Sequence, residues 1–227
     1  MRDLKLVLFD VDGTLLDSQN FIIQAVRNCF VSMGRAVPKR ADIRAIVGLS
    51  LEAAMAQLAP DLTGAQNTEA ARALKESFLS LRAKTGGEAS MPTYPGTREM
   101  LDRLGAVDEI FLGIATNKAR LGVDHFLESH GLTGRFHTIQ TVDNHPGKPH
   151  PAMAEAALSE LGIDKRNAVL VGDTTFDMQL AHNAGIGAIG VDWGYHTAAD
   201  LREAGASHVL TSFAGLDAVL DEIWGTV

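Results

Sequence analysis

The sequence predicts an α/β protein: an open parallel sheet with helices on both faces, carrying an inserted all-helical segment. Short apolar runs that end in polar turn residues alternate with helical patterns along most of the 227 residues, and such alternation favours a parallel sheet. Residues 19–84 break the alternation, because they carry helical patterns and no strand pattern. Since this stretch follows the first strand, we expect it to be an insertion.

The first strand is predicted at residues 4–9, an apolar run closed by polar turn residues. In the inserted stretch, Phe21, Ala25, Cys29 and Met33 recur at helical spacing and predict a helix with one apolar face. A pair of adjacent glycines ends the stretch and predicts a flexible join. The helices predicted within the insertion cover residues 21–34, 51–60 and 67–84.

The remaining chain alternates helix and strand to its end. Pro95 to Thr97 open a short helix, and buried strands then alternate with amphipathic helices. We therefore expect a sheet-forming core, residues 1–17 and 88–227, and a separate helical cap, residues 18–87. The strands predicted after the insertion are 109–116, 136–141, 168–172, 186–191 and a short 208–210, and the helices are 118–130, 151–162, 175–184 and 216–224.

Composition limits the class of protein. A net charge of −8 argues against a broad nucleic-acid surface. Cys29 is the only cysteine, so an internal disulfide is impossible, which fits a reducing cytosol. Apolar runs fall short of the ~20 residues that span a bilayer, and the first residues lack a signal-peptide pattern. We expect a cytoplasmic protein, a monomer or homodimer, that binds neither membrane nor nucleic acid.

Chemically active side chains follow the predicted strands at the carboxyl edge of the sheet, where open parallel sheets bind ligands. Four acids meeting there would oppose each other's ionisation, and one lysine cannot balance them. All-oxygen ligation without clustered His or Cys favours Mg²⁺ over zinc. The side chains that we expect to gather at this edge are Asp10, Asp12, Thr116, Asn117, Lys148, Asp173 and Asp177.

Four motifs resemble those of a known family. They are "DVDGTL" (10–15), "ATNK" (115–118), "GKPHP" (147–151) and "GDTTFD" (172–177). In this order and spacing the chain resembles a phosphatase of the haloacid dehalogenase superfamily, in the branch with a helical cap after the first strand. The stretches "YPGTREML" and "VDWGYH" also resemble its phosphoglycolate phosphatase-like members. The resemblance implies a Rossmann-like core with an inserted cap domain, and phosphoglycolate as the leading substrate candidate.

The resemblance also implies residue roles. Asp10 is expected to be the nucleophile that forms an aspartyl-phosphate, a covalent intermediate that divides one difficult step into two. Asp12 is expected to protonate the leaving oxygen, to activate water afterwards, and to bind the metal through its backbone carbonyl. The expected Mg²⁺ ligands are thus Asp10, Asp12 and Asp173, with Asp177 acting directly or through water.

Phosphate binding is expected from Thr116, Asn117 and Lys148, with Lys148 also neutralising Asp10. The stretch "IVGLSLE" (46–52) resembles the cap loop that inspects the rest of the substrate, although a plain turn between helices would look the same. This resemblance makes the cap residues Arg44, Gly48, Leu49 and Ser50 candidates for substrate specificity. The roles of four further residues near the motifs stay open: His145, His150, Trp193 and Tyr195.

Other reactions of the family stay open as alternatives. A dehalogenase would usually lack an acid at the position of Asp12, and a sugar phosphomutase would usually carry arginine where this chain has Leu51. After "KPHP" the family usually has aspartate, and here Ala152 stands there. A phosphonate hydrolase, a pyrophosphatase, a phospho-accepting switch and a metabolite-binding module also remain, as do sugar phosphates and nucleotide monophosphates as substrates.

Overall fold

The computed structural model describes residues 3–225, which contain a six-stranded parallel sheet. The strand order is β3-β2-β1-β4-β5-β6, so the first strand lies in the middle, between β2 and β4. This order places the ends of β1, β2 and β4 side by side. The strands are β1 (Lys5–Phe9), β2 (Ile110–Thr116), β3 (Thr138–Thr141), β4 (Ala168–Gly172), β5 (Gly187–Val191) and β6 (His208–Leu210).

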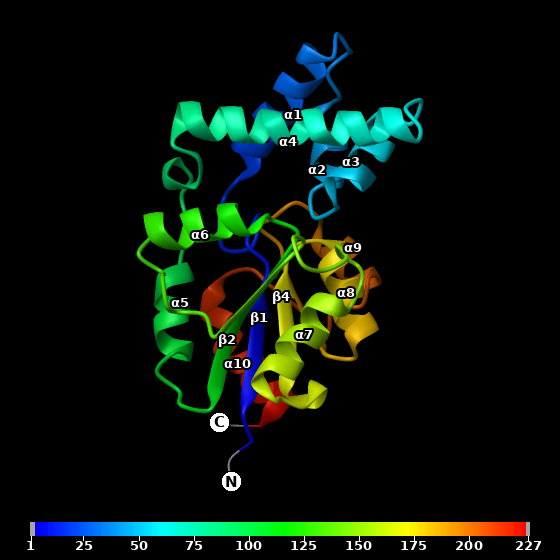
Figure 1. Cartoon of the computed structure of the whole chain (residues 1–227). Coiled ribbons are helices and arrows are strands. Elements are labelled where there is room, and N and C mark those ends of the chain that lie inside the picture. Colours follow the sequence, from blue (N-terminus) through cyan, green and yellow to red (C-terminus); the bar gives the residue numbers. More distant parts are fainter. Residues whose placement is uncertain (1–2, 226–227) are drawn as a thin grey trace.

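Helices cover both faces of the sheet, as predicted (Figure 1). Alternate residues of β1 point to opposite faces: Val7 and Phe9 join one apolar cluster, and Leu6 and Leu8 join the other. The helices and 3₁₀ turns of the core are η1 (Gly87–Ser90), α5 (Thr97–Leu104), α6 (Arg120–Ser129), α7 (Ala152–Leu161), η2 (Lys165–Asn167), α8 (Thr175–Ala184), α9 (Ala198–Glu203), η3 (Phe213–Gly215) and α10 (Leu216–Trp224).

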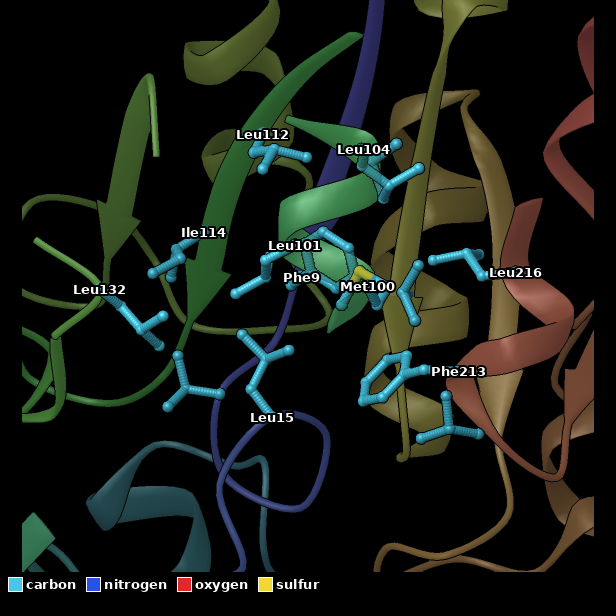
Figure 2. Close-up of a cluster of buried hydrophobic side chains, with 14 of the residues drawn as sticks. Phe9, Leu15, Met100, Leu101, Leu104, Leu112, Ile114, Leu132, Phe213 and Leu216 are labelled. Atoms are coloured by element: carbon cyan, nitrogen blue, oxygen red, sulfur yellow. The ribbon is translucent and has the colours of Figure 1, made fainter. Parts of the chain in front are cut away.

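The first apolar cluster packs α5, α6 and α10 against the sheet (Figure 2). Met100 and Leu101 of α5 and Phe213 of η3 lie around Phe9 in this cluster, all of them fully or almost fully buried. Helices α7, α8 and α9 contribute to the second cluster on the other face. Burial on both faces explains why the strands read as continuous apolar runs.

The inserted segment forms four helices beyond the carboxyl edge of the sheet (Figure 1). They enclose their own apolar cluster, which includes Cys29, Phe30, Met55 and Leu74. The two connecting segments run side by side, because the Asp17 N–H donates to the Pro92 carbonyl at 2.9 Å. The helices are α1 (Gln19–Ser32), α2 (Arg40–Ala45), α3 (Leu51–Leu58) and α4 (Ala65–Thr85).

The predicted fold class is confirmed, with local differences. Helices α2 and α9 were not predicted; α9 begins with a capping box between Thr197 and Asp200 that the sequence displays. The strand predicted at 136–141 begins only at Thr138. Just before it, the His137 N–H still donates to the Leu112 carbonyl at 2.8 Å, while the Leu112 N–H donates to the imidazole of His137 at 3.1 Å. Within residues 3–225, the helices are too short or too polar to cross a membrane.

Candidate active site

Four loops meet at the carboxyl edge of the sheet, and each brings a buried polar side chain. Asp10 follows β1, Thr116 ends β2 and Asp173 follows β4, while Lys148 lies in the loop between β3 and α7. These four residues are at most 3% exposed. The strand order brings them together, as the sequence predicts.

Three acids form the centre of this site. Asp10, Asp173 and Asp177 each offer a carboxylate oxygen, and these oxygens lie within 4.8 Å of one another. The Nζ of Lys148 lies 2.9 Å from Asp10 Oδ1 and 2.6 Å from Asp177 Oδ1. The fourth predicted acid, Asp12, does not turn its carboxylate into this cluster, because that carboxylate pairs with Lys118 instead.

Burial makes this group of acids electrostatically unfavourable. Burial raises the pKa of Asp10 to about 6, an effect that Lys148 partly offsets and Asp177 reinforces. Burial also raises the pKa of Asp173 well above its usual value, with Asp177 and Asp10 adding to the effect. For Lys148, burial alone would lower the pKa, but the two facing carboxylates outweigh burial and raise it. One ammonium therefore leaves the three carboxylates undercompensated.

The cluster fits a hard divalent cation. Within residues 3–225, the buried Oδ1 of Asp10 has its ion pair with Lys148 but no well-aligned hydrogen bond. Clustered carboxylate oxygens without thiolates or imidazoles suit Mg²⁺ better than zinc. A cation there would satisfy the unbonded oxygen and relieve the repulsion among Asp10, Asp173 and Asp177. The donor set of this chain is thus compatible with the predicted Mg²⁺.

Neighbouring groups hold the two later acids in place. The Thr174 N–H and hydroxyl both donate to Asp177 Oδ2, at 3.0 and 2.6 Å, in a capping box that starts α8. The Thr14 hydroxyl donates to Asp173 Oδ1 at 2.9 Å. Gly13 adopts φ +91°, and a Cβ there would lie 2.3 Å from Asp173 Oδ2. The "DGT" turn therefore needs glycine for both its backbone and its space.

The second motif lies beside Asp10. Thr116 is 1% exposed, and its hydroxyl accepts a hydrogen bond from the Lys118 N–H at 3.2 Å. The Asn117 side chain accepts from the Lys148 N–H at 3.0 Å and donates to the Gly48 carbonyl at 2.8 Å. Asn117 thus braces the lysine loop against the helical insertion, and its predicted contact with phosphate stays a prediction.

Two of the predicted cap residues, Arg44 and Gly48, contact the core, and the other two pack within the helical insertion. Arg44 donates to the carbonyls of Gly194 and Tyr195, at 2.9 and 3.1 Å. A Cβ on Gly48 would lie 3.0 Å from Thr174 Oγ1, so this loop closely approaches the active-site edge. Leu49 packs against the apolar cluster of the insertion, and the Ser50 hydroxyl caps α3. Their role in specificity stays a prediction.

The four residues of open role contact protein groups. His145 bonds to Gln140 and the His150 ring accepts from the Ala152 N–H, at 2.8 and 3.2 Å. The Trp193 indole donates to the Thr14 carbonyl at 3.2 Å. Tyr195 is closest to the acids, because its N–H donates to Asp173 Oδ2 at 2.8 Å.

Two charged residues near Asp12 were not predicted from the sequence as part of the site. Lys118 Nζ lies 3.0 and 3.1 Å from the two Asp12 carboxylate oxygens and 3.1 Å from Glu88 Oε1. Lys118 is the last residue of the "ATNK" motif, and this position in the motif could have indicated that it belongs to the site. Glu88 follows a glycine pair that predicted only a flexible join, and no local pattern marks it as buried.

The parallel sheet, the inserted helices and the carboxylate-rich edge fit the class of hydrolases that have a Rossmann-like core and a carboxylate active site. Residues 7–191 match the family model of haloacid dehalogenase-like hydrolases, and the chain belongs to this family. The predicted family is thereby confirmed.

Named relatives agree with this assignment. The chain is 36% identical to "Probable phosphatase IndB" of Dickeya dadantii, over 92% of this chain and 90% of that protein. It is 31% identical to "Phosphoglycolate phosphatase" of Xylella fastidiosa, over 86% of this chain and 82% of the relative. A hydrolase crystal structure from Pseudomonas syringae matches with a TM-score of 0.84 at 24% identity, covering 96% of this chain and 99% of that one, which supports the fold.

Proposed function

We propose that this protein is a Mg²⁺-dependent phosphatase that hydrolyses a small phosphorylated metabolite through an aspartyl-phosphate on Asp10. The observation that carries the proposal is the position of Asp10, paired with Lys148 and gathered with Asp173 and Asp177 at the ligand-binding edge of the sheet. The match to relatives named phosphatases supports the same reaction.

The residues divide the proposed reaction between them. An Asp10 carboxylate oxygen attacks phosphorus, and the bond from phosphorus to the leaving oxygen breaks. Asp12 gives that oxygen a proton and later takes one from the water that hydrolyses the aspartyl-phosphate. Lys148 and Thr116 hold the transferring group and offset its charge. Asp10, Asp173, the Asp12 carbonyl and Asp177 would hold the Mg²⁺ ion, which would neutralise charge on the phosphoryl oxygens.

The helical insertion is proposed to act as a cap domain, residues 18–87, that excludes bulk water from the reaction. Its position beyond the carboxyl edge of the sheet supports this role (Figure 1), as does the hydrogen bond between Asn117 and the Gly48 carbonyl. Residues Gly48, Leu49 and Ser50, with Arg44, are the proposed contacts to the part of the substrate beyond its phosphate.

Phosphoglycolate is the proposed substrate, supported by the relative from Xylella fastidiosa that carries this name. Purified protein with Mg²⁺ should release phosphate from phosphoglycolate faster than from sugar phosphates, nucleoside monophosphates or pyrophosphate. If another compound were hydrolysed faster, phosphoglycolate would be wrong as the substrate, but the phosphatase reaction would stand. The proposed phosphatase activity would be overturned if the protein released halide from a 2-haloacid without metal and released no phosphate from any of these phosphorylated compounds.

Removal of divalent metal should abolish phosphate release, because the acid cluster would then lack the cation that it needs. Activity should return on adding Mg²⁺. Bound metal should also stabilise the fold, by about 2.7 kcal/mol at a hundred times its dissociation constant. Phosphate release and thermal unfolding, each measured with chelator and with Mg²⁺, check both effects. Undiminished activity after thorough chelation would contradict the metal assignment.

Asp12→Ala should lower the rate on an alkyl phosphate by about 10²–10⁴-fold, the usual range for general acid–base catalysis. Steady-state phosphate release measures the change. Asp124→Ala is a suitable control, because Asp124 forms an exposed ion pair with Arg120 on α6. A loss of less than a few-fold for Asp12→Ala would remove Asp12 from this role.

A further inference from the structure

Lys118 lies between two carboxylates that come from opposite ends of the inserted segment. Asp12 precedes the insertion, and its two oxygens lie 3.0 and 3.1 Å from Lys118 Nζ. Glu88 lies in η1, just after the insertion, with Oε1 3.1 Å from the same atom. The Lys118 side chain is only 10% exposed, so this ammonium has few alternative partners in water.

Glu88 is held more firmly than an ordinary surface acid. It is fully buried and accepts hydrogen bonds from Arg82 Nε and Nη2, at 2.9 and 2.7 Å. His125 of α6 bonds to the same carboxylate at 2.8 Å. Burial alone would raise the pKa of Glu88, but the neighbouring Lys118, Arg82 and His125 lower it to about 2. The carboxylate is therefore ionised and fixed from three sides.

Helix α6 leaves space for this network at a single glycine. A Cβ on Gly122 would lie 2.8 Å from Arg82 Nη2, 2.9 Å from Lys118 Cε and 3.1 Å from Glu88 Oε1. A side chain there would displace members of the network. The helix surface is thus shaped to let Arg82, Glu88 and Lys118 meet.

We propose that Glu88 is a positioning residue: it fixes Lys118, and Lys118 in turn fixes the Asp12 carboxylate for proton transfer. This inference rests on the proposed phosphatase function, in which Asp12 is the general acid and base. Arg82, near the end of α4, connects the helical insertion to the same network. The position of the acid is therefore linked to the packing of the insertion on the core.

Fixing Lys118 matters because its chain is long and flexible. Of the two carboxylates that hold the Lys118 ammonium, only Asp12 would remain without Glu88. The Lys118 and Asp12 side chains could then move together as a pair. The carboxylate would then lose its fixed distance to the leaving oxygen, and a displacement near 1 Å can cost about 10²-fold in rate. Glu88 touches no reacting atom, so its effect would act only through Lys118 and Asp12.

The test is Glu88→Gln, assayed on two esters with Mg²⁺ present. An alkyl phosphate needs a proton on its leaving oxygen, whereas 4-nitrophenyl phosphate releases a weakly basic phenolate and needs little help. We compare kcat/KM, because it excludes the later hydrolysis of the aspartyl-phosphate, a step that both esters share. We expect kcat/KM on the alkyl ester to fall about 10-fold or more, and kcat/KM on 4-nitrophenyl phosphate to fall less than about 3-fold. A purely structural defect would lower both rates by the same factor.

Equal losses on both esters, or no loss on either, would overturn the inference. Lys118→Met provides a second variant if Glu88→Gln does not fold, and it should change the ratio of the two rates in the same direction. Glu76→Gln is the matched control, because Glu76 pairs with Arg72 on the exposed side of α4 and should leave the ratio unchanged. A wild-type protein that releases no phosphate from these esters or from the substrate panel would instead refute the proposed function.

Discussion

Asp10→Asn should abolish phosphate release, by at least about 10⁴-fold, with Mg²⁺ present. An amide has the shape of the carboxylate but lacks the nucleophilic charge, so the aspartyl-phosphate cannot form. The substitution also removes one oxygen donor from the acid cluster and one of the two ion-pair partners of Lys148. Trapping the reaction with acid and measuring phosphate bound to the protein should show a phosphoprotein for the wild type and none for the variant.

Thermal unfolding of the metal-free wild type and variant tests whether the lost activity reflects a loss of folding. Burial raises the pKa of Asp10 to about 6, above the ordinary value of 3.8. A raised carboxyl pKa means that the ionised group costs folding free energy above pH 6, and this cost disappears below about pH 4. At pH 7 the metal-free variant should therefore unfold at the same temperature as the wild type, or a higher one. Normal turnover by Asp10→Asn would rule out the aspartyl-phosphate mechanism.

The sequence was sufficient to predict that Asp10, Thr116 and Asp173 meet, for a geometric reason. Asp10, Thr116 and Asp173 each stand at the end of a short apolar run, and parallel strands place such ends at one edge. Helix α8 begins two residues after Asp173, and its first turn therefore carries Asp177 to the same edge of the sheet. Position along a regular element therefore carries information about position in space.

Contacts that depend on loops and on long side chains could not be predicted in this way. Glu88 follows two glycines that suggest flexibility, yet packing against Arg82 and His125 buries it completely. Arg44 was predicted as a specificity residue, and only the structure shows its bonds to the backbone of the loop at Gly194 and Tyr195. Nothing local in the sequence encodes which distant backbone meets a long side chain.

Lys148→Met should combine a large loss of activity with a loss of stability. Lys148 is 3% exposed and pairs with both Asp10 and Asp177, so its removal leaves buried carboxylates without their cation. Breaking a buried ion pair in this way typically costs about 3–5 kcal/mol. Loss of a charge that stabilises the transferring phosphoryl group should lower kcat by about 10²–10³-fold.

Urea unfolding with and without Mg²⁺ separates the two effects. The metal-free variant should unfold at clearly lower urea than the wild type, and Mg²⁺ should recover part of this difference because it also neutralises the cluster. Lys165→Met, which removes an exposed lysine from η2, is the matched control and should change neither property. If Lys148→Met unfolded at the wild-type urea concentration in chelator, the buried carboxylates would not depend on Lys148 for their charge balance.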